Sequence, residues 1–228
     1  MQNKKFIIFG VTAVLLSFYG AFMVWTNYQA DKTITTLQAL ITEKHGQLDI
    51  VPVPHTILTT TVQGPSSPGS LKNVFFTVPF VPTLTRNESE NGVVYNGDAG
   101  KVLAFMKTFS VFDEKWKTYH NVQSDYDAYT RIHNITLAEV NSLQHSKQEK
   151  IRLTTLAFTK GGMTTPNTPL YSFSTSEVKG FQIGNPTTQT TISLELFDSS
   201  NGQYKYSILT GNLTQTEIDT ILSSITIQ

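Results

Sequence analysis

Residues 190–225, TTISLELFDSSNGQYKYSILTGNLTQTEIDTILSSI, decide the fold class of this chain. Two β-prone runs, Thr190–Phe197 and Gln203–Thr210, flank Asn201-Gly202, a dipeptide that favours the tight turn of a β-hairpin. Side chains two residues apart share one face of a strand, so each run predicts one apolar face. These faces consist of Ile192, Leu194 and Leu196 in the first strand and of Tyr204, Tyr206 and Ile208 in the second.

A helix is predicted directly after this hairpin. Thr214-Gln215-Thr216-Glu217 is a capping box, in which the Thr214 hydroxyl and the Glu217 carboxylate satisfy free backbone N–H groups. Apolar residues then recur at helical spacing, which predicts a short amphipathic helix that packs on the sheet. Its apolar stripe consists of Ile218, Ile221, Leu222 and Ile225.

The region before the hairpin contains further strands and a helical block. The order of strands, helices, strands and helix lacks the regular alternation of a parallel sheet. We therefore expect an α+β domain with an antiparallel sheet, a helical insertion and a C-terminal amphipathic helix. The predicted strands are 73–79, 92–96, 101–110, 170–174 and 178–183, with a hairpin turn at 97–100. The predicted helices are 124–133, 136–145 and 147–159, although residues 151–159 also fit a strand.

Two stretches of the chain resemble PsbP-like domains, which are α/β/α sandwiches with a central antiparallel sheet. YKYSILTGNLTQTEIDTILSSI, at 204–225, is similar to the closing hairpin, turn and capped helix of that family. NVFFTVPFVPTLTRNESENGVVY, at 73–95, is similar to its aromatic first strand, which proline ends, and the next hairpin. The resemblance covers about a third of the chain and implies an accessory or assembly role, without any functional residue to carry over.

A hydrophobic segment near the N-terminus predicts a membrane anchor. Phe6 to Trp25 reads FIIFGVTAVLLSFYGAFMVW and holds no charged residue. A helix of that length rises about 30 Å, the thickness of the hydrocarbon core of a bilayer. Lys4 and Lys5 precede it, which favours a cytoplasmic N-terminus. We expect a single-pass signal-anchor that contacts the lipid bilayer and leaves the C-terminal domain periplasmic or extracellular.

Two other interpretations of this segment are weaker. A cleaved signal peptide has a shorter apolar region and a small-x-small cleavage site, whereas bulky aromatic residues stand at the nearest candidate sites here. A buried core helix fits this segment less well than a membrane helix does, because the segment is apolar on every face. Ala13, Ser17 and Ala21 recur at spacing four, which is typical of helix–helix contacts in lipid. We therefore predict another membrane protein as a partner.

The composition pattern divides the chain into three parts. Residues 1–29 form the cytoplasmic stub and the transmembrane anchor. Residues 30–70 begin as a juxtamembrane helix, because 31–45 contain no Pro or Gly, and continue as a linker rich in Pro, Thr and Ser. A short strand near 56–62 fits the linker as well. Residues 71–228 form the α+β domain, which is long enough for one ordinary core.

Composition and charge exclude several classes of protein. The chain has 228 residues, 17 basic and 17 acidic side chains and no cysteine. Zero net charge argues against a dedicated nucleic-acid binder, which needs a basic surface. The absence of cysteine excludes disulfides, thiol catalysis and iron–sulfur clusters.

Searches for catalytic and metal-binding patterns give no site. The five histidines show no HxH or HExxH spacing, although His120, His133 and His145 can converge within the helical block. No GxSxG elbow or phosphate-binding loop is present. We therefore predict no cofactor, no metal and no catalytic residue. An acid or a serine within hydrogen-bond reach of one of these histidines would favour a hydrolase with a dispersed site.

Aromatic residues gather at the start of the helical block. The binding patch that we consider consists of Trp116, Tyr119, Tyr126 and Tyr129. Such residues can line a ligand groove or a protein-binding surface, but they more often seal a helix onto a sheet.

Three functions remain at this stage. The first is a membrane-anchored, extracytoplasmic accessory or interaction subunit of a membrane or envelope assembly, without catalysis. The second is a sensor or small-ligand-binding module, with a pocket between the sheet and the helical block. The third is a hydrolase.

Overall fold

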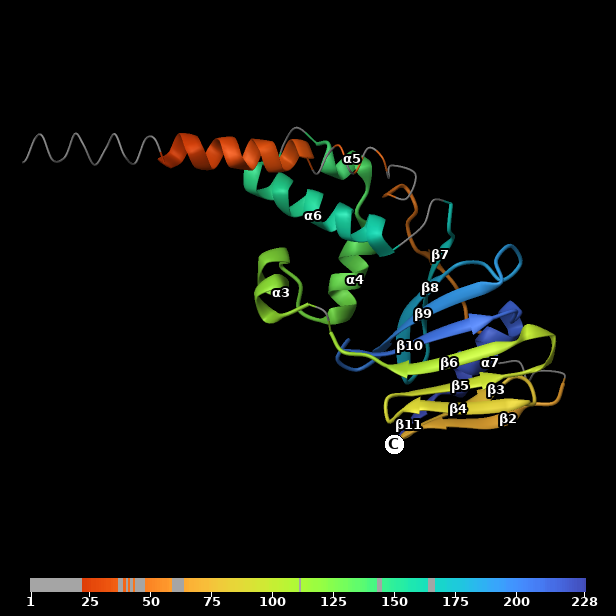
Figure 1. Cartoon of the computed structure of the whole chain (residues 1–228). Coiled ribbons are helices and arrows are strands. Elements are labelled where there is room, and N and C mark those ends of the chain that lie inside the picture. Colours follow the sequence, from red (N-terminus) through yellow and green to blue (C-terminus); the bar gives the residue numbers. More distant parts are fainter. Residues whose placement is uncertain are drawn as a thin grey trace, which may run out of the picture.

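The computed structural model describes residues 22–36, 39, 41, 43, 48–58, 64–110, 112–142, 145–163 and 167–228. These residues form an α+β fold with two sheets and two apolar cores (Figure 1). The predicted α+β class is therefore confirmed.

The larger sheet has eight strands in the order β1-β7-β8-β9-β10-β6-β5-β4. All neighbouring pairs are antiparallel except β1 and β7, which are parallel, so the sheet is mixed and the prediction of an antiparallel sheet needs this correction. The strands are β1 (Val53–Pro54), β4 (Leu84–Ser89), β5 (Gly92–Asn96), β6 (Val102–Lys107), β7 (Leu170–Ser174), β8 (Val178–Ile183), β9 (Thr191–Asp198) and β10 (Tyr204–Gly211).

One face of this sheet meets helix α7 (Gln215–Ser224) and a small antiparallel sheet of β2 (Ser67–Leu71), β3 (Val74–Val78) and β11 (Thr226–Ile227). We call this packing region the first core. The predicted capping box is present, since Thr214 and Glu217 bond reciprocally at the start of α7. The apolar stripe of α7 is buried, and each such side chain contributes about 1.5–3 kcal/mol to stability. The first core includes Val74, Phe76, Phe105, Leu194, Ile208, Ile218, Ile221 and Leu222.

The helical block packs on the other face, beside β7, β8 and β9, and forms the second core. It consists of α3 (Glu114–His120), α4 (Asp125–Asn134), α5 (Leu137–Val140) and α6 (Lys147–Met163). Figure 1 shows these helices gathered at one end of the large sheet, whereas α7 lies behind the sheet in the same view. The second core includes Leu48, Phe112, Tyr129, Ile132, Leu153, Leu156, Phe181 and Phe197.

A β-bulge changes which residues of β10 share a face. The pairing with β9 shifts between Tyr204 and Tyr206, so Tyr206 and Ile208 face the first core while Tyr204 packs in the second. The prediction that these three share one face is therefore wrong for Tyr204. The backbone N–H of Tyr204 donates to the Asp125 carboxylate on α4, at 3.0 Å. Helix packing thus supplies a partner for an N–H group near the bulge.

The predicted transmembrane helix is contradicted. Among the described residues, no helix is both long and apolar enough to cross a membrane. The first described helix covers 22–36 and carries Asp31 and Lys32, so it contains only the end of the predicted span. The remainder of that span, with Ala13, Ser17 and Ala21, lies outside the described residues. The single-pass signal-anchor, the lipid contact and the periplasmic or extracellular location are not retained, because each depended on this helix.

The stretch predicted as a linker takes part in the fold. Leu48 is fully buried in the second core, β1 pairs with β7, and β2 joins the small sheet. Lys160 on α6 donates to the backbone oxygen of Leu48 at 2.9 Å. Proline has no backbone N–H to donate to a neighbouring strand, so strands that contain it are confined to sheet edges. Both β1 and β2 lie at the edge of their sheet.

Candidate functional site

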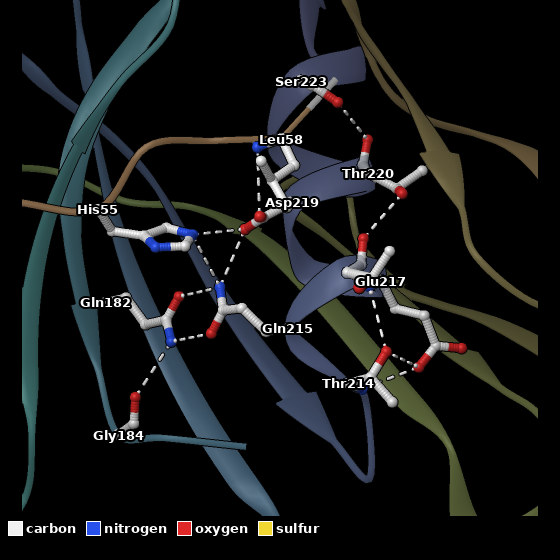
Figure 2. A network of polar contacts seen from close by, with 11 residues as sticks. His55, Leu58, Gln182, Gly184, Thr214, Gln215, Glu217, Asp219, Thr220 and Ser223 are labelled. Atoms are coloured by element: carbon white, nitrogen blue, oxygen red, sulfur yellow. Dashed lines mark hydrogen bonds and ion pairs between the residues drawn. The ribbon is translucent and has the colours of Figure 1, made fainter. Parts of the chain in front are cut away.

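The first two turns of α7 carry polar side chains to two sides of the helix. Figure 2 shows Gln215 and Asp219 turned toward His55, whereas Glu217 points to the opposite side. The capping box holds this part of the helix, since the Glu217 N–H donates to the Thr214 hydroxyl and the Thr214 N–H to the Glu217 carboxylate. Each side forms a distinct candidate site.

On the Glu217 side, the protein surface is hollowed into a cavity of about 400 Å³. Small-molecule sites in proteins commonly range from about 300 to 1,000 Å³ and are mostly apolar with a few convergent polar groups. The walls here follow that pattern. They come from Gly64, Pro65, Pro79, Phe80, Val81, Asp98, Ala99, Lys101 and Glu217.

An ion pair lies in the cavity wall. The Lys101 ammonium donates to Glu217 Oε1 at 2.6 Å, and Glu217 Oε2 accepts from the Thr214 N–H at 2.8 Å and from its hydroxyl at 3.0 Å. Burial opposes ionisation of Glu217, but these hydrogen bonds outweigh it and hold the pKa below its usual value. Glu217 is therefore a fixed carboxylate that positions Lys101.

On the other side, Asp219 is fully buried and binds residues from outside α7. His55 Nε2 lies 2.9 Å from Asp219 Oδ1, and the Leu58 N–H donates to Oδ2 at 3.2 Å. Gln215 Nε2 donates to Oδ1 at 2.9 Å. The bonds from His55 and Leu58 attach the stretch around β1 to α7, while the bond from Gln215 lies within the helix.

The hydrogen bonds determine which nitrogen of His55 carries a proton. Gln182 and Gln215 donate to each other, at 2.8 and 3.0 Å, and their remaining N–H groups donate to Gly184 O and to Asp219. Because a carboxylate only accepts, His55 Nε2 is the donor to Asp219 Oδ1, and Gln215 Nε2 lies 3.3 Å from the same ring nitrogen. His55 is thus oriented as in a histidine–aspartate pair, with Nδ1 as the acceptor when the ring is neutral.

The three histidines of the helical block do not converge on one site. His133 Nε2 lies 3.1 Å from Glu195 on β9, and His145 Nδ1 lies 3.2 Å from Glu149. His120 packs against the Trp116 ring within α3, and burial together with nearby Arg152 and Arg131 lowers its pKa to about 4. Among the described residues, no three His, Asp or Glu side chains form a metal site.

The His133–Glu195 pair meets the distance condition for a dispersed hydrolase site but lies within the second core. His133 has no exposed side-chain surface. The Tyr129 and Phe181 rings pack against its imidazole, and the Phe197 ring packs against Phe181. A substrate has no access to a group in that position. The pair therefore locates α4 against the sheet, because a buried polar contact specifies one arrangement.

The predicted aromatic patch is divided by the fold. Trp116 stacks on Phe112 at 4.1 Å, Tyr126 stacks on Phe181, and Tyr129 is 4% exposed. These three pack in or against the second core, while Tyr119 is 43% exposed. Core packing, the alternative considered from the sequence, accounts for most of the patch.

Sequence reasoning missed the residues of the α7 sites. Asp98 lies in the turn predicted at 97–100, and Glu217 is part of the predicted capping box. Both local predictions are confirmed, but neither indicates that Lys101 meets Glu217, 116 residues away. His55 and Asp219 are 164 residues apart, within segments predicted as linker and terminal helix.

No family model, curated protein or solved structure matches this chain. The resemblance to PsbP-like domains therefore stays a prediction.

Proposed function

We propose that this chain is a small-ligand-binding module that uses the cavity beside the N-terminal end of α7. The observation that carries the proposal is a mostly apolar hollow of about 400 Å³ that is lined by three charged side chains, Asp98, Lys101 and Glu217. The cavity differs in place from the pocket expected between the sheet and the helical block, since that region is filled by the second core.

Binding fits the chemistry of these groups better than catalysis does. Glu217 already accepts three hydrogen bonds and is held ionised, so it is a poor general base. The Lys101 side chain donates to that carboxylate at 2.6 Å and is engaged as a hydrogen-bond donor, which does not suit it to act as a nucleophile. The walls can still supply apolar contact and charge, which suffice to hold a ligand.

The test is a ligand-observed NMR screen of small acids, amines and amino acids against the full chain. Val81 lines the cavity and is 55% exposed, so Val81→Trp should obstruct it without disturbing either core. Val53→Trp is a matched control, because Val53 is also 55% exposed but lies on β1 outside the cavity. We expect compounds that bind wild type and Val53→Trp and lose binding to Val81→Trp. Compounds that bind all three proteins equally would contradict the proposal.

A second proposal is that the chain is an accessory or interaction subunit without catalysis of its own. The start of helix 22–36 favours it, because large apolar side chains there are 43–70% exposed. Exposed apolar surfaces of this kind commonly mark sites of protein association. These side chains are Phe22, Met23, Val24, Trp25 and Tyr28.

Site-specific photocrosslinking in the native cell tests this second proposal. A photoreactive residue at Trp25 should give a discrete protein adduct, whereas one at Lys32, an exposed position on the same helix, should not. Adducts of equal yield at both positions, or recovery of the chain alone, would exclude a partner at this surface.

A further inference from the structure

Two oppositely charged groups in the cavity retain unused hydrogen-bonding capacity. A lysine ammonium has three donors, and Lys101 uses one of them on Glu217. Within the described part of the chain, the Asp98 carboxylate has no hydrogen-bond or ion-pair partner, and it does not pair with Lys101. The cavity wall therefore holds a carboxylate without a partner and an ammonium with unused donors, and the two do not form an ion pair with each other.

Hydrogen bonds fix the backbone of the turn that carries Asp98 and Lys101. Asp98 and Lys101 border a tight turn, in which the Lys101 N–H donates to Asp98 O and the Gly97 N–H to Lys101 O. Asn212 Nδ2 donates to the backbone oxygen of Gly100 at 3.1 Å, which ties the turn to the end of β10. A ligand would thus meet two side chains whose backbone is already ordered, which reduces the entropy lost on binding.

Another part of the wall is apolar and rigid. Phe80 is 6% exposed and packs so closely on Gly97 that a Cβ there would lie 2.5 Å from its ring. Pro65, Pro79 and Val81 complete this wall, and prolines have little freedom to rearrange. One end of the cavity therefore favours an aliphatic or aromatic group of a ligand.

From this arrangement we propose that the cavity binds a zwitterionic small molecule with an apolar substituent, of the α-amino acid class. The ligand carboxylate accepts from the free donors of Lys101, its ammonium donates to Asp98, and its side chain packs on Phe80 and Val81. This inference rests on the proposed ligand-binding function. It adds the ligand class, which follows from the presence of the Asp98 carboxylate and the Lys101 ammonium in the same mostly apolar cavity.

The charges also predict which half of the zwitterion matters more. Asp98 and Glu217 together carry two negative charges against the single positive charge of Lys101. A ligand that keeps its carboxylate but loses its ammonium adds a negative charge to an already negative site. N-acetyl-L-leucine should therefore bind more weakly than L-leucine methyl ester.

Isothermal titration of the full chain with L-leucine, these two derivatives and neutral 3-methylbutanol tests the inference. We expect L-leucine to bind best, and Asp98→Asn to weaken it roughly tenfold, as for loss of one charged hydrogen bond. Glu114→Gln is the charge-matched control, since Glu114 is 90% exposed on α3 and should leave binding unchanged.

The results separate this inference from the proposed function. If 3-methylbutanol binds as tightly as L-leucine and Val81→Trp abolishes both, the cavity binds ligands but does not recognise a zwitterion. If L-leucine does not bind at millimolar concentrations, the amino-acid class is excluded. If L-leucine binds Val81→Trp and wild type equally, the cavity is not the site.

Discussion

Replacing Lys160 by Met should change how the stability of the protein depends on pH. Lys160 has no exposed surface, and its Nζ donates to the backbone oxygens of Leu48 and Ile135, both at 2.9 Å. Burial disfavours the charged ammonium and lowers the pKa of Lys160 from 10.5 to about 8, although Asp49 opposes this shift. Met is of similar length and cannot titrate, so the pH-dependent part of the difference in stability reports on the charge, while the two lost hydrogen bonds add a constant term.

The expected size follows from linkage between protonation and folding. Between pH 8 and 10.5 the unfolded chain binds more protons at Lys160 than the folded one, so wild-type stability rises with pH. One pKa unit corresponds to about 1.4 kcal/mol, so between pH 7 and pH 10 the free energy of unfolding of wild type should rise by about 2 to 3 kcal/mol relative to that of Lys160→Met. Well below pH 8 the difference between the two free energies of unfolding should be constant. A neutral amine keeps two N–H donors, so both hydrogen bonds can persist.

Urea denaturation of both proteins at several pH values from 7 to 10 measures this difference. Titrations elsewhere in the chain cancel, because both proteins share them. Lys115→Met serves as a control, since Lys115 is exposed on α3 and its removal should leave the pH profile parallel to wild type. Parallel profiles for Lys160→Met as well would refute the argument that burial disfavours the Lys160 charge.

Four further substitutions test the packing and the polar contacts. Gly180→Ala should destabilise the protein by several kcal/mol, because the new Cβ would lie 1.9 Å from a backbone oxygen of β9. Gly162→Ala meets nothing within 4 Å and should stabilise α6 by up to about 1 kcal/mol. Thermal denaturation should therefore show a lower melting temperature for the first variant and a higher one for the second. Asp219→Asn should weaken the bond to His55 and increase proteolysis near β1, and unchanged cleavage would show that this bond does not hold the segment. Burial raises the pKa of Asp125, but hydrogen bonds outweigh it and lower the pKa below the usual value. The stability that the Asp125 charge contributes is therefore present above about pH 4 and is lost as the pH falls below that. In an acid titration, the excess stability of wild type over Asp125→Asn should disappear, and an excess independent of pH would contradict this.

Elements with short-range signals could be predicted from the sequence. The capping box of α7 needs only Thr214 and Glu217, three residues apart, and it forms as expected. The turn at Asn201-Gly202 joins β9 to β10, with Gly202 at a φ of 69° that suits glycine. The faces of β9 follow the period of two, because that strand pairs regularly along most of its length.

Predictions failed where the outcome depends on distant groups. Tyr204 leaves the face of Tyr206 because of a bulge beside a bond from its N–H to Asp125, 79 residues earlier. The Pro-rich stretch was predicted as a linker from composition, yet Leu48 fits into the second core. The apolar run from Phe6 to Trp25 predicted a membrane helix by its length, a conclusion that the described helices contradict.

The amino-acid order alone specified the hairpin of β9 and β10, the capped helix α7 and the α+β class, because these depend on contacts within a few residues and on regular periodicity. The tertiary structure decided the pairing of Lys101 with Glu217 and of His55 with Asp219, across 116 and 164 residues. Such partners meet only after two apolar cores have oriented the sheet and α7. The candidate cavity is therefore a product of packing, and no local pattern in the chain predicts it.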